Sequence, residues 1–218
     1  MASAEARATI NPYADYVDDP EATAGGLDSY LALLTRWQAA QNLVSRETLP
    51  AFWQRHAADS LQLLKYIAPE DRAFVDLGSG GGLPAIPLAI ALRGRPGAAF
   101  TLVEPNQRKA SFLRAAGREL GLSLNVEARR ADEIDSRETL LPDVITSRAL
   151  ASLPALCVLS APFFGPNTRA LLHKGREHVE ELEESRALWQ FDVLILPSDT
   201  SGDGAILEIR NLQARSAT

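Results

Sequence analysis

One segment constrains the fold of this chain more than any other. An apolar stretch at Ala73–Leu77 is followed by glycines at alternate positions, Gly78, Gly80 and Gly82, and then by an apolar stretch from Ala85 to Leu92. The stretches predict a strand and a helix around a turn whose glycines take a positive φ and let a ligand approach without meeting a Cβ atom. Because the helix would point free N–H groups at that ligand, the segment predicts a nucleotide-cofactor turn.

The spacing of these glycines indicates the kind of cofactor. The dinucleotide fingerprint G-x-G-x-x-G would place its third glycine at position 83, where this chain has Leu83. Here the third glycine comes one residue early, and Asp76 stands two residues before the first. This D-x-G-x-G-x-G form resembles the first motif of class I S-adenosylmethionine (SAM) methyltransferases. An acid near the turn also suits a cationic cofactor that has no pyrophosphate.

A second acidic residue adds to this prediction. Phe100–Glu104 has the pattern of a strand that ends in an acid, roughly twenty residues after the turn. In an open α/β sheet that position lies beside the first strand, where a carboxylate can accept hydrogen bonds from both ribose hydroxyls. We therefore expect Asp76, the glycines and Glu104 to form a cofactor pocket; the alternative is a surface glutamate that starts a helix.

Length and composition indicate one α/β domain with a small addition. The 218 residues suffice for a full core. The one cysteine, Cys157, excludes a disulfide framework and a cysteine zinc site, so a reducing cytoplasm is expected. The N-terminus has no signal pattern and no apolar run is long enough to cross a membrane, so no membrane partner is expected. The formal net charge of −6 gives no prior for nucleic-acid binding. Basic residues nevertheless gather in the middle of the chain, at Arg93, Arg95, Arg108, Lys109, Arg114, Arg118, Arg129 and Arg130.

The order of the predicted elements indicates a Rossmann-like, doubly wound α/β domain over residues 71–218, with a seven-stranded, mostly parallel sheet and an antiparallel strand near the C-terminal edge. Residues 1–25 are Ala-rich and polar and predict a flexible or loosely packed lead-in. Residues 26–70 predict a cap of two helices, over Leu27–Gln41 and about 50–67. Strands are predicted near 73–77, 99–104, 124–129, 143–147, 169–173, 191–196 and 205–210, and helices near 85–93, 106–120, 152–160 and 176–189.

Several further segments follow one another in a characteristic order. They are Trp37–Ser45, Arg55–Leu61, Gly82–Pro84, Lys109–Leu113, Arg130–Glu133, Ser147–Leu153 and His173–Gly175. Together they resemble the bacterial small-subunit ribosomal RNA methyltransferases called RsmG or GidB. The first is similar to the family's W-N-x-x-x-N-L-T/V-S and the second to its R-H-x-x-D-S-L, and the likeness extends over about residues 27–210.

The resemblance implies a reaction and a set of contacts. It implies methyl transfer from SAM to N7 of a guanine in the decoding-region loop of 16S rRNA (guanine 527 in the usual rRNA numbering), with the small ribosomal subunit as partner. It implies that Gly78 and Leu83 contact the methionine and ribose part of SAM. It further implies that Ala131 and Asp132 bracket the adenine, and that Arg148, as catalytic residue, lies at the pocket mouth beside both the cofactor and the incoming base.

Two positions depart from the family's pattern. The family usually has an arginine shortly before its last strand, whereas the matching place here, near Gly204, holds none. This departure bears on RNA contact by the C-terminal edge, where Arg210 is expected to compensate only in part. The chain also has Gln38 where the family often has Asn, which we interpret as a local packing change.

The absence of certain catalytic motifs from the sequence agrees with methylation at guanine N7. N7 carries a lone pair and no proton, so its methylation needs alignment of the reactants and no general base. The N/D-P-P-Y motif of amino-group methyltransferases is absent, and Thr146–Ala149 stands in its place. A cysteine nucleophile, which pyrimidine carbon methylation needs, is not expected either, because Cys157 lies among apolar residues on a predicted buried helix face.

Arg148 is the polar residue that we single out first. Its planar fork can donate to the O6 edge of guanine or to a phosphate and so orient N7 toward the methyl group. The alternative is an arginine at a strand end that pairs with a nearby acid such as Asp132. The basic helix of Arg108, Lys109, Arg114 and Arg118 is either an rRNA phosphate contact or a solvated face.

Four other residues are predicted on the substrate side. His56 and Asp59 are three residues apart and share one face of the second helix, where they either close the pocket or form a structural hydrogen bond. No further ligand falls at metal spacing from them, so no metal is predicted. Ser147 precedes Arg148. Lys174 ends the fifth strand as either a phosphate contact or a solvated strand end.

The chain is expected to be a monomer. Three functions other than rRNA methylation are alternatives to this prediction. The first is a small-molecule SAM methyltransferase, which the cofactor motifs support equally. The second is a SAM-fold protein that binds RNA as a regulator without turnover. The third, a nicotinamide-dependent oxidoreductase, is disfavoured by the glycine spacing. The cap motifs and the segment around Arg148 favour the rRNA methyltransferase.

Overall fold

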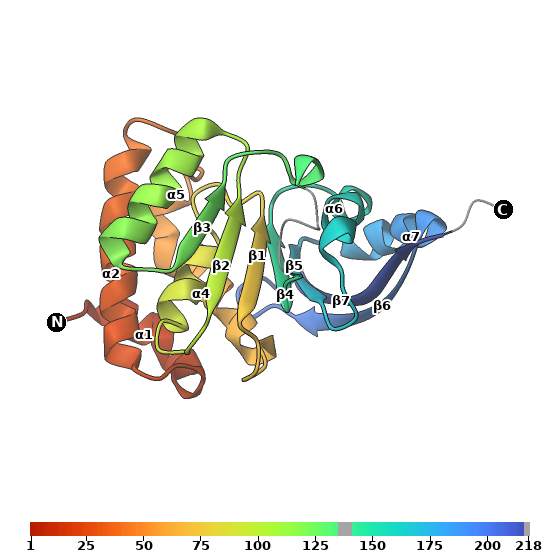
Figure 1. Ribbon diagram of the computed structural model, residues 1–218. Helices are drawn as coiled ribbons and strands as arrows, with labels where there is room; N and C mark the ends of the chain where they lie inside the picture. The colour runs from red at the N-terminus through yellow and green to blue at the C-terminus, as the bar shows by residue number, and fades with distance from the viewer. Residues whose placement is uncertain (135–140, 216–218) are drawn as a thin grey trace.

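The computed structural model describes residues 1–134 and 141–215, which build one twisted sheet of seven strands (Figure 1). The strands lie in the order β3-β2-β1-β4-β5-β7-β6. Strands β1 to β5 pair in parallel, whereas β7 is antiparallel to both β5 and β6. The bounds are β1 Ala73–Leu77, β2 Ala99–Val103, β3 Leu124–Glu127, β4 Val144–Arg148, β5 Arg169–Lys174, β6 Trp189–Pro197 and β7 Ala205–Ala214. The predicted mostly parallel sheet with an antiparallel strand near its C-terminal edge is confirmed.

Helices cover both faces of this sheet (Figure 1). Phe74 and Leu102 face a core shared with α1, α2, α4 and α5, while Val75 and Ile145 face a core shared with α6 and α7. Neighbouring strand residues enter opposite cores because side chains alternate along a strand, which is why these strands carry apolar residues on both faces. The bounds are α1 Ala4–Ile10, α2 Pro20–Gln38, α4 Ala85–Ala91, α5 Gln107–Leu120, α6 Leu153–Ser160 and α7 His178–Leu188.

The N-terminal residues differ from the flexible or loosely packed lead-in that the sequence predicts. They form α1, the helical turn η1 (Asn11–Tyr16) and the first turn of α2, and they bury Ala6 and Ile10 in the first core. Ser3 caps α1 by accepting from the N–H of Ala6, and Asp19 caps α2 in the same way. The prediction failed because the small alanine side chains on the buried face give only a weak helical pattern of apolar residues. The capping residues Ser3 and Asp19 could nevertheless have been recognised as helix starts from the sequence.

The second cap helix is a chain of short helical turns instead of one regular helix. It comprises η2 (Leu49–Ala51), the π-helical η3 (Trp53–Ala58), α3 (Asp59–Leu61) and η4 (Gln62–Tyr66). A π turn in such a run is often found where a side chain has to be directed into a functional site. Here it carries His56, and Asp59 follows directly. Among the described helices, none has the length and apolar character to cross a membrane.

Candidate functional site

The parallel register of three strands brings the predicted acidic and basic residues to one edge of the sheet. Leu77 of β1 lies opposite Val103 of β2 and Ser147 of β4. Asp76, Glu104 and Arg148 therefore stand at the same ends of adjacent strands, as carboxyl ends of parallel strands do in a doubly wound sheet. The glycine turn leaves β1 at this edge.

The glycine turn has the backbone that the sequence predicts. Gly78, Gly80 and Gly82 have φ values of +70°, +55° and +88°. These values favour glycine because a Cβ atom is strained there. The N–H of Gly78 donates to the carbonyl of Val103 across 2.9 Å, which ties the turn to β2.

Asp76 is buried and only partly satisfied. Its Oδ1 accepts from the hydroxyl of Thr146 across 2.7 Å, while its Oδ2 has no hydrogen-bond partner among the described residues. Burial raises the pKa of the Asp76 carboxyl to about 7, because removal from water disfavours the charged form. A buried acid with an unused oxygen beside a glycine turn is suited to a cationic ligand.

Glu104 supports the turn directly. Its Oε2 accepts from the N–H of Gly80 across 2.8 Å, and its Oε1 accepts from the N–H of Asn106 across 2.8 Å. Each carboxylate oxygen retains a lone pair for a further donor. The side chain is buried and lies at the end of β2, where the sequence placed it.

Ala131 and Asp132 lie in the helical turn η5 (Ala131–Glu133) after β3. Ala131 is buried in the second core, whereas Asp132 is exposed and pairs with Arg130 across 2.9 Å. The Arg130 guanidinium lowers the pKa of the Asp132 carboxyl. Asp132 is thus ionised at neutral pH and its exposed carboxylate is open to an external donor.

A cavity of about 320 Å³ lies between the glycine turn and the cap; we call it the glycine-turn cavity. Gly78, Gly80 and Leu83 line it from the turn, Arg148 from β4, and Thr48 from the cap. Glu104, Ala131 and Asp132, which are predicted to contact the ribose and the adenine, are not among the described residues that line it.

The cap holds the glycine turn through contacts that the sequence does not reveal. The buried hydroxyl of Tyr30 on α2 donates to the carbonyl of Gly81 across 2.5 Å. Gln38 donates from Nε2 to the carbonyl of Val44 and accepts the N–H of Leu43, which braces the segment that covers Gly81. Gln38 also accepts the N–H of Val44, so it makes three hydrogen bonds to one loop. The local packing change that the sequence predicts at Gln38 takes this form.

Arg148 is held by the cap instead of by Asp132. Its Nη2 lies 2.8 Å from Nδ1 of His56, and its Nη1 lies 3.2 Å from Oδ2 of Asp59. The second contact is an ion pair without hydrogen-bond alignment, since Nη1 has no hydrogen-bond partner among the described residues. The alternative prediction, an arginine that pairs with a nearby acid, holds for Asp59 but is wrong in the example of Asp132, which pairs with Arg130.

The hydrogen bonds of His56 define its protonation state. An arginine can only donate, so Nδ1 accepts. Nε2 lies 2.9 Å from Oγ1 of Thr48, whose own hydrogen is donated to the carbonyl of Ser45, so Nε2 carries the proton and donates. His56 is neutral, and burial together with the Arg148 charge lowers its pKa to about 4.

Asp59 accepts hydrogen bonds at one carboxylate oxygen, while the other oxygen forms the ion pair with Arg148. Its Oδ1 accepts from Oγ1 of Thr200 across 2.6 Å and from Nε2 of Gln62 across 2.9 Å. Its backbone carbonyl accepts from Nε2 of His173 across 2.8 Å. Thr200 was missed by the sequence analysis because nothing local in the loop between β6 and β7 indicates that it meets the cap.

Ser147 and Lys174 serve the framework of the site. The buried Ser147 donates to the carbonyl of Leu77 across 2.9 Å. Lys174, at the end of β5, pairs with Glu181 across 2.6 Å and donates to the carbonyl of Ala151 across 3.0 Å. The Lys174 side chain is thus neither a solvated strand end nor free for a phosphate; it holds the loop that follows Arg148.

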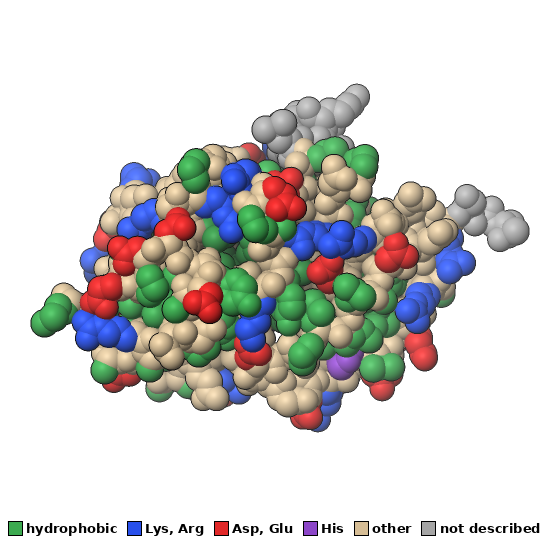
Figure 2. Space-filling view, turned by 90° about the horizontal axis from the view of Figure 1, so that it is seen from below, with side chains coloured by type: hydrophobic (Ala, Val, Ile, Leu, Met, Phe, Trp, Pro, Cys, Tyr) green, Lys and Arg blue, Asp and Glu red, His purple; other side chains and the backbone are tan. Residues whose placement is uncertain are grey.

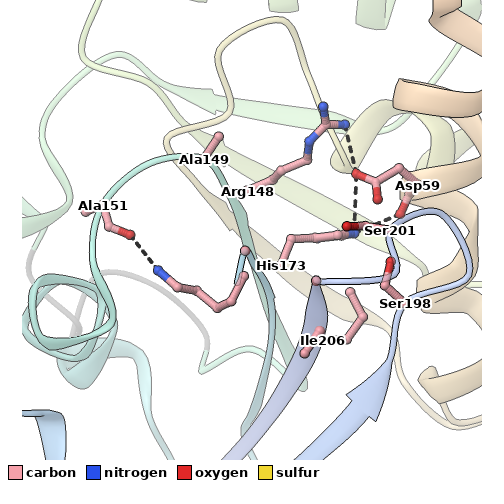
Figure 3. A pocket seen from close by; sticks show the side chains of 12 residues that line it. Asp59, Arg148, Ala149, Ala151, His173, Ser198, Ser201 and Ile206 are labelled. Atoms are coloured by element: carbon pink, nitrogen blue, oxygen red, sulfur yellow. Dashed lines mark hydrogen bonds and ion pairs between the residues drawn. The ribbon is translucent and has the colours of Figure 1, made fainter. Parts of the chain in front are cut away.

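A cavity of about 250 Å³ lined by Arg55, Asp59, Arg148, Thr200 and Ser201 lies at this site, and two further cavities adjoin it. One, of about 250 Å³, is lined by Asp59, Arg148, His173 and the loop between β6 and β7; we call it the His173 cavity (Figure 3). Gly204 belongs to its lining, whereas Arg210 pairs with Glu208 and is not among the described residues that line it. Among the described residues, no cluster of His, Cys, Asp or Glu has metal-binding geometry.

The other cavity, of about 470 Å³, lies outside the glycine turn and is lined by Arg46, Arg108 and Lys109; we call it the basic groove. Lys109 lines both the basic groove and the glycine-turn cavity, so the two lie side by side. Other basic residues serve the framework: Arg93, Arg95 and Arg114 donate to backbone carbonyls. Cys157 is buried, and burial raises the pKa of its thiol to about 11, in keeping with a packing role.

Comparisons with known proteins agree on one family. The model of the family described as "GidB: rRNA small subunit methyltransferase G" matches residues 24–204. A "Ribosomal RNA small subunit methyltransferase G" from Cereibacter sphaeroides is 43% identical over 197 residues, 90% of this chain and 94% of the relative. One from Methylobacterium sp. (strain 4-46) is 44% identical over 191 residues, 87% of this chain and 89% of the relative.

Solved structures support the fold. A mutant of MtNAS in complex with S-adenosylmethionine has a TM-score of 0.54 at 21% identity, over 87% of this chain and 76% of that one. A ribosomal protein L11 methylase from Lactobacillus delbrueckii subsp. bulgaricus has a TM-score of 0.53 at 14% identity, over 71% of this chain and 77% of that one. At these identities the likeness concerns the fold alone.

Proposed function

Because the chain belongs to the family of rRNA small subunit methyltransferase G, we propose that it transfers a methyl group from SAM to N7 of a guanine in 16S rRNA. The resemblance that the sequence motifs carry is confirmed, as is the class I SAM methyltransferase fold. Within 16S rRNA we propose the guanine of the decoding-region loop, position 527 in the usual rRNA numbering, as the acceptor.

The residues at the sheet edge fit a cationic nucleoside cofactor. Asp76 holds an unpartnered buried oxygen, and Glu104 has lone pairs left on both oxygens at the end of the adjacent strand. The positive φ of Gly80 exposes its backbone to the glycine-turn cavity. When bound, SAM supplies an electrophilic methyl group. We assign Asp76, Gly78, Gly80, Gly82, Leu83, Glu104, Ala131 and Asp132 to holding it.

The protein groups beside the cavity are suited to positioning an acceptor that carries no proton. His56 is neutral, and its one free lone pair already accepts from Arg148, so it is not poised as a general base. Arg148 stands with its fork between the glycine-turn cavity and the His173 cavity. It can therefore donate to the O6 edge of a guanine and direct N7 toward the methyl group, which is the alignment that N7 methylation needs. This is the observation that carries the proposal.

An RNA backbone would reach this site along the basic groove. Arg46, Arg108 and Lys109 line that groove up to the glycine-turn cavity. By contrast, acidic and basic side chains are interspersed among hydrophobic ones on the face shown in Figure 2, which presents no uniform basic surface. Phosphates therefore favour the groove, where cations are not matched by acidic neighbours in its lining.

We further propose that the enzyme acts as a monomer in the cytoplasm, on the small ribosomal subunit. The single cysteine is free and buried, in keeping with a reducing compartment. The match to the family over most of the chain favours this function over the small-molecule methyltransferase, the RNA-binding regulator and the nicotinamide oxidoreductase.

Methyl transfer to defined RNA substrates tests the proposal. Labelled SAM would be incubated with the enzyme and small subunits from a strain that lacks the modification, with protein-free 16S rRNA and large subunits in parallel. We expect label in the small subunits and none in the large subunits. If protein-free 16S rRNA is labelled at an equal rate, the substrate would be naked rRNA and not the small subunit. SAM binding without label in any RNA would refute the rRNA methyltransferase.

A further inference from the structure

The His173 cavity lies across Arg148 from the glycine turn. Arg148 and Ala149 line both cavities, so these two residues form the wall that the cavities share. Ala151 and Ile206 add small apolar surfaces, and Gly175 adds none. The volume of about 250 Å³ far exceeds the roughly 10–15 Å³ that one water needs, so the cavity admits a small organic group.

Three polar groups at this cavity have unused hydrogen-bonding capacity. Nη1 of Arg148 and Nδ1 of His173 are buried without a hydrogen-bond partner among the described residues. The His173 side chain is 9% exposed. Its Nε2 donates to the carbonyl of Asp59, and burial lowers its pKa, so the ring is neutral and Nδ1 is an acceptor. Oδ2 of Asp59 has only the misaligned ion pair with Arg148, and it lies 3.9 Å from His173 Nε2. Buried polar groups normally find partners, so the two buried atoms, Nη1 of Arg148 and Nδ1 of His173, indicate a ligand, and the partly buried Asp59 carboxylate lies beside them.

The donors and acceptors match one edge of one base. Guanine presents O6, N1–H and the N2 amino group side by side, which is one acceptor followed by donors. Arg148 Nη1 can only donate and an ionised Asp59 can only accept, and the two stand 3.2 Å apart (Figure 3). Adenine would place its own N1 acceptor against the carboxylate, which is unfavourable. The pair therefore distinguishes guanine from adenine.

We propose that the His173 cavity holds the acceptor guanine turned out of the RNA, with Oδ2 of Asp59 accepting from N1–H and the N2 amino group while Arg148 donates to O6. This assignment rests on the proposed guanine methyltransferase function and makes Asp59 the residue that reads the base. N7 adjoins O6 on the far side from N1, so a base held in this way turns N7 past Arg148 toward the glycine-turn cavity. Enzymes that modify a base in RNA or DNA commonly read it in this manner, by its Watson–Crick edge.

The carboxylate is fixed for this task before the base arrives. Thr200 and Gln62 both bind Oδ1, which leaves Oδ2 toward Arg148 and His173, two residues that line the cavity. The same contacts predict how an asparagine would sit. In Asp59→Asn the carbonyl oxygen would take the place of Oδ1, because Gln62 donates to it, and the amide NH₂ would face the cavity. A donor would then oppose the donors of guanine.

Inosine at the acceptor position separates this proposal from the function on which it rests. Inosine keeps O6, N7 and N1–H and lacks only the N2 amino group. Small subunits would be assembled from ligated 16S rRNA that carries guanosine or inosine at the acceptor position, and kcat/KM for methyl transfer compared. Loss of a hydrogen bond to a charged acceptor predicts a wild-type preference for guanosine of roughly 10- to 100-fold. No transfer to either substrate would refute the proposed function itself.

Two variants complete the experiment. Asp59→Asn should lower transfer to guanosine and reduce the guanosine-to-inosine ratio to about one. Asp199→Asn is the matched control, because Asp199 lies in the same loop as Thr200 but pairs with Lys65, and it should keep the wild-type ratio. An equal fall with both bases in Asp59→Asn would reduce Asp59 to a positioning residue for Arg148. Wild-type acceptance of inosine within about twofold of guanosine would overturn the proposal without any variant.

Discussion

Nη2 of Arg148 lies 2.8 Å from Nδ1 of His56, so one hydrogen bond joins the end of β4 to the helical cap across 92 residues of sequence. The bond requires a neutral histidine, since a protonated Nδ1 could not accept. Asp59, three residues further on, pairs with the same arginine. The cap thereby orients the arginine that separates the two cavities of the site.

Removal of the Arg148 guanidinium should affect turnover more than cofactor binding. In Arg148→Ala we expect kcat to fall by roughly 100-fold or more, because a charged donor that orients the acceptor is lost. SAM affinity should change by less than about threefold. Arg148→Lys should not restore the rate, since an ammonium cannot span His56 and the base as a planar fork does. Steady-state rates and calorimetric SAM affinities measure both quantities; an equal loss in the two would make Arg148 a cofactor clamp only.

The glycine turn should not tolerate a side chain at Gly80. Its φ of +55° is strained for valine, and a side chain there would enter the glycine-turn cavity. Gly80→Val should weaken SAM binding by at least roughly 100-fold. Gly121→Ala is the control, because its φ of +63° carries the same strain at the end of α5 with no atom within 4 Å of the added Cβ. The control should cost about 1 kcal/mol of stability and leave SAM affinity unchanged; unchanged affinity in Gly80→Val would remove the turn from the cofactor site.

Asp76 should make the stability of the cofactor-free protein depend on pH. Its folded pKa of about 7 lies above that of an unfolded aspartate, so the native state holds the proton more tightly. Between about pH 4 and pH 7 the native state therefore binds more protons, and the free energy of unfolding falls as pH rises through this window. Urea unfolding of the wild type and of Asp76→Asn across that range isolates the contribution of Asp76 to the pH dependence of the free energy of unfolding. A difference between the two that stays constant with pH would contradict the raised pKa.

The basic groove should give RNA binding a steep salt dependence. Arg108→Gln and Lys109→Gln should each weaken binding and reduce the slope of log affinity against log salt by about 1. Arg114→Gln is the control on the same helix, because its guanidinium donates to the carbonyl of Val126. Filter binding of small subunits at several salt concentrations gives the slopes. Equal slopes for all four proteins would place RNA recognition outside the groove.

The residues at the strand ends were predictable because local patterns determine them. Alternating strands and helices imply parallel strands, and parallel strands bring Asp76, Glu104 and Arg148 to one edge whatever the details of packing. The glycine turn was equally readable, since glycines at alternate positions indicate a backbone with positive φ. The antiparallel β7 followed from the succession of two strands without a helix between them.

The partners of these residues were not predictable from local patterns. The sequence offered Asp132 as a neighbour for Arg148, whereas the structure supplies His56 and Asp59 from the cap. Contacts between segments that are far apart in the sequence produce no regular residue spacing from which they could be predicted. Thr200 anchors Asp59 from 141 residues away, and no local signal marks it. Lys174 similarly forms an ion pair with Glu181 on α7, whereas the sequence suggested that it faces solvent or a phosphate.

Mapping of the methylated atom tests the central claim most directly. Small subunits from a strain that lacks the modification would be labelled by the enzyme and SAM, and their 16S rRNA treated with borohydride and aniline, which cleave the chain at N7-methylated guanosine. We predict cleavage at one guanine of the decoding-region loop that coincides with the label. Label that resists this cleavage, or that lies on another base, would contradict the proposed N7 transfer.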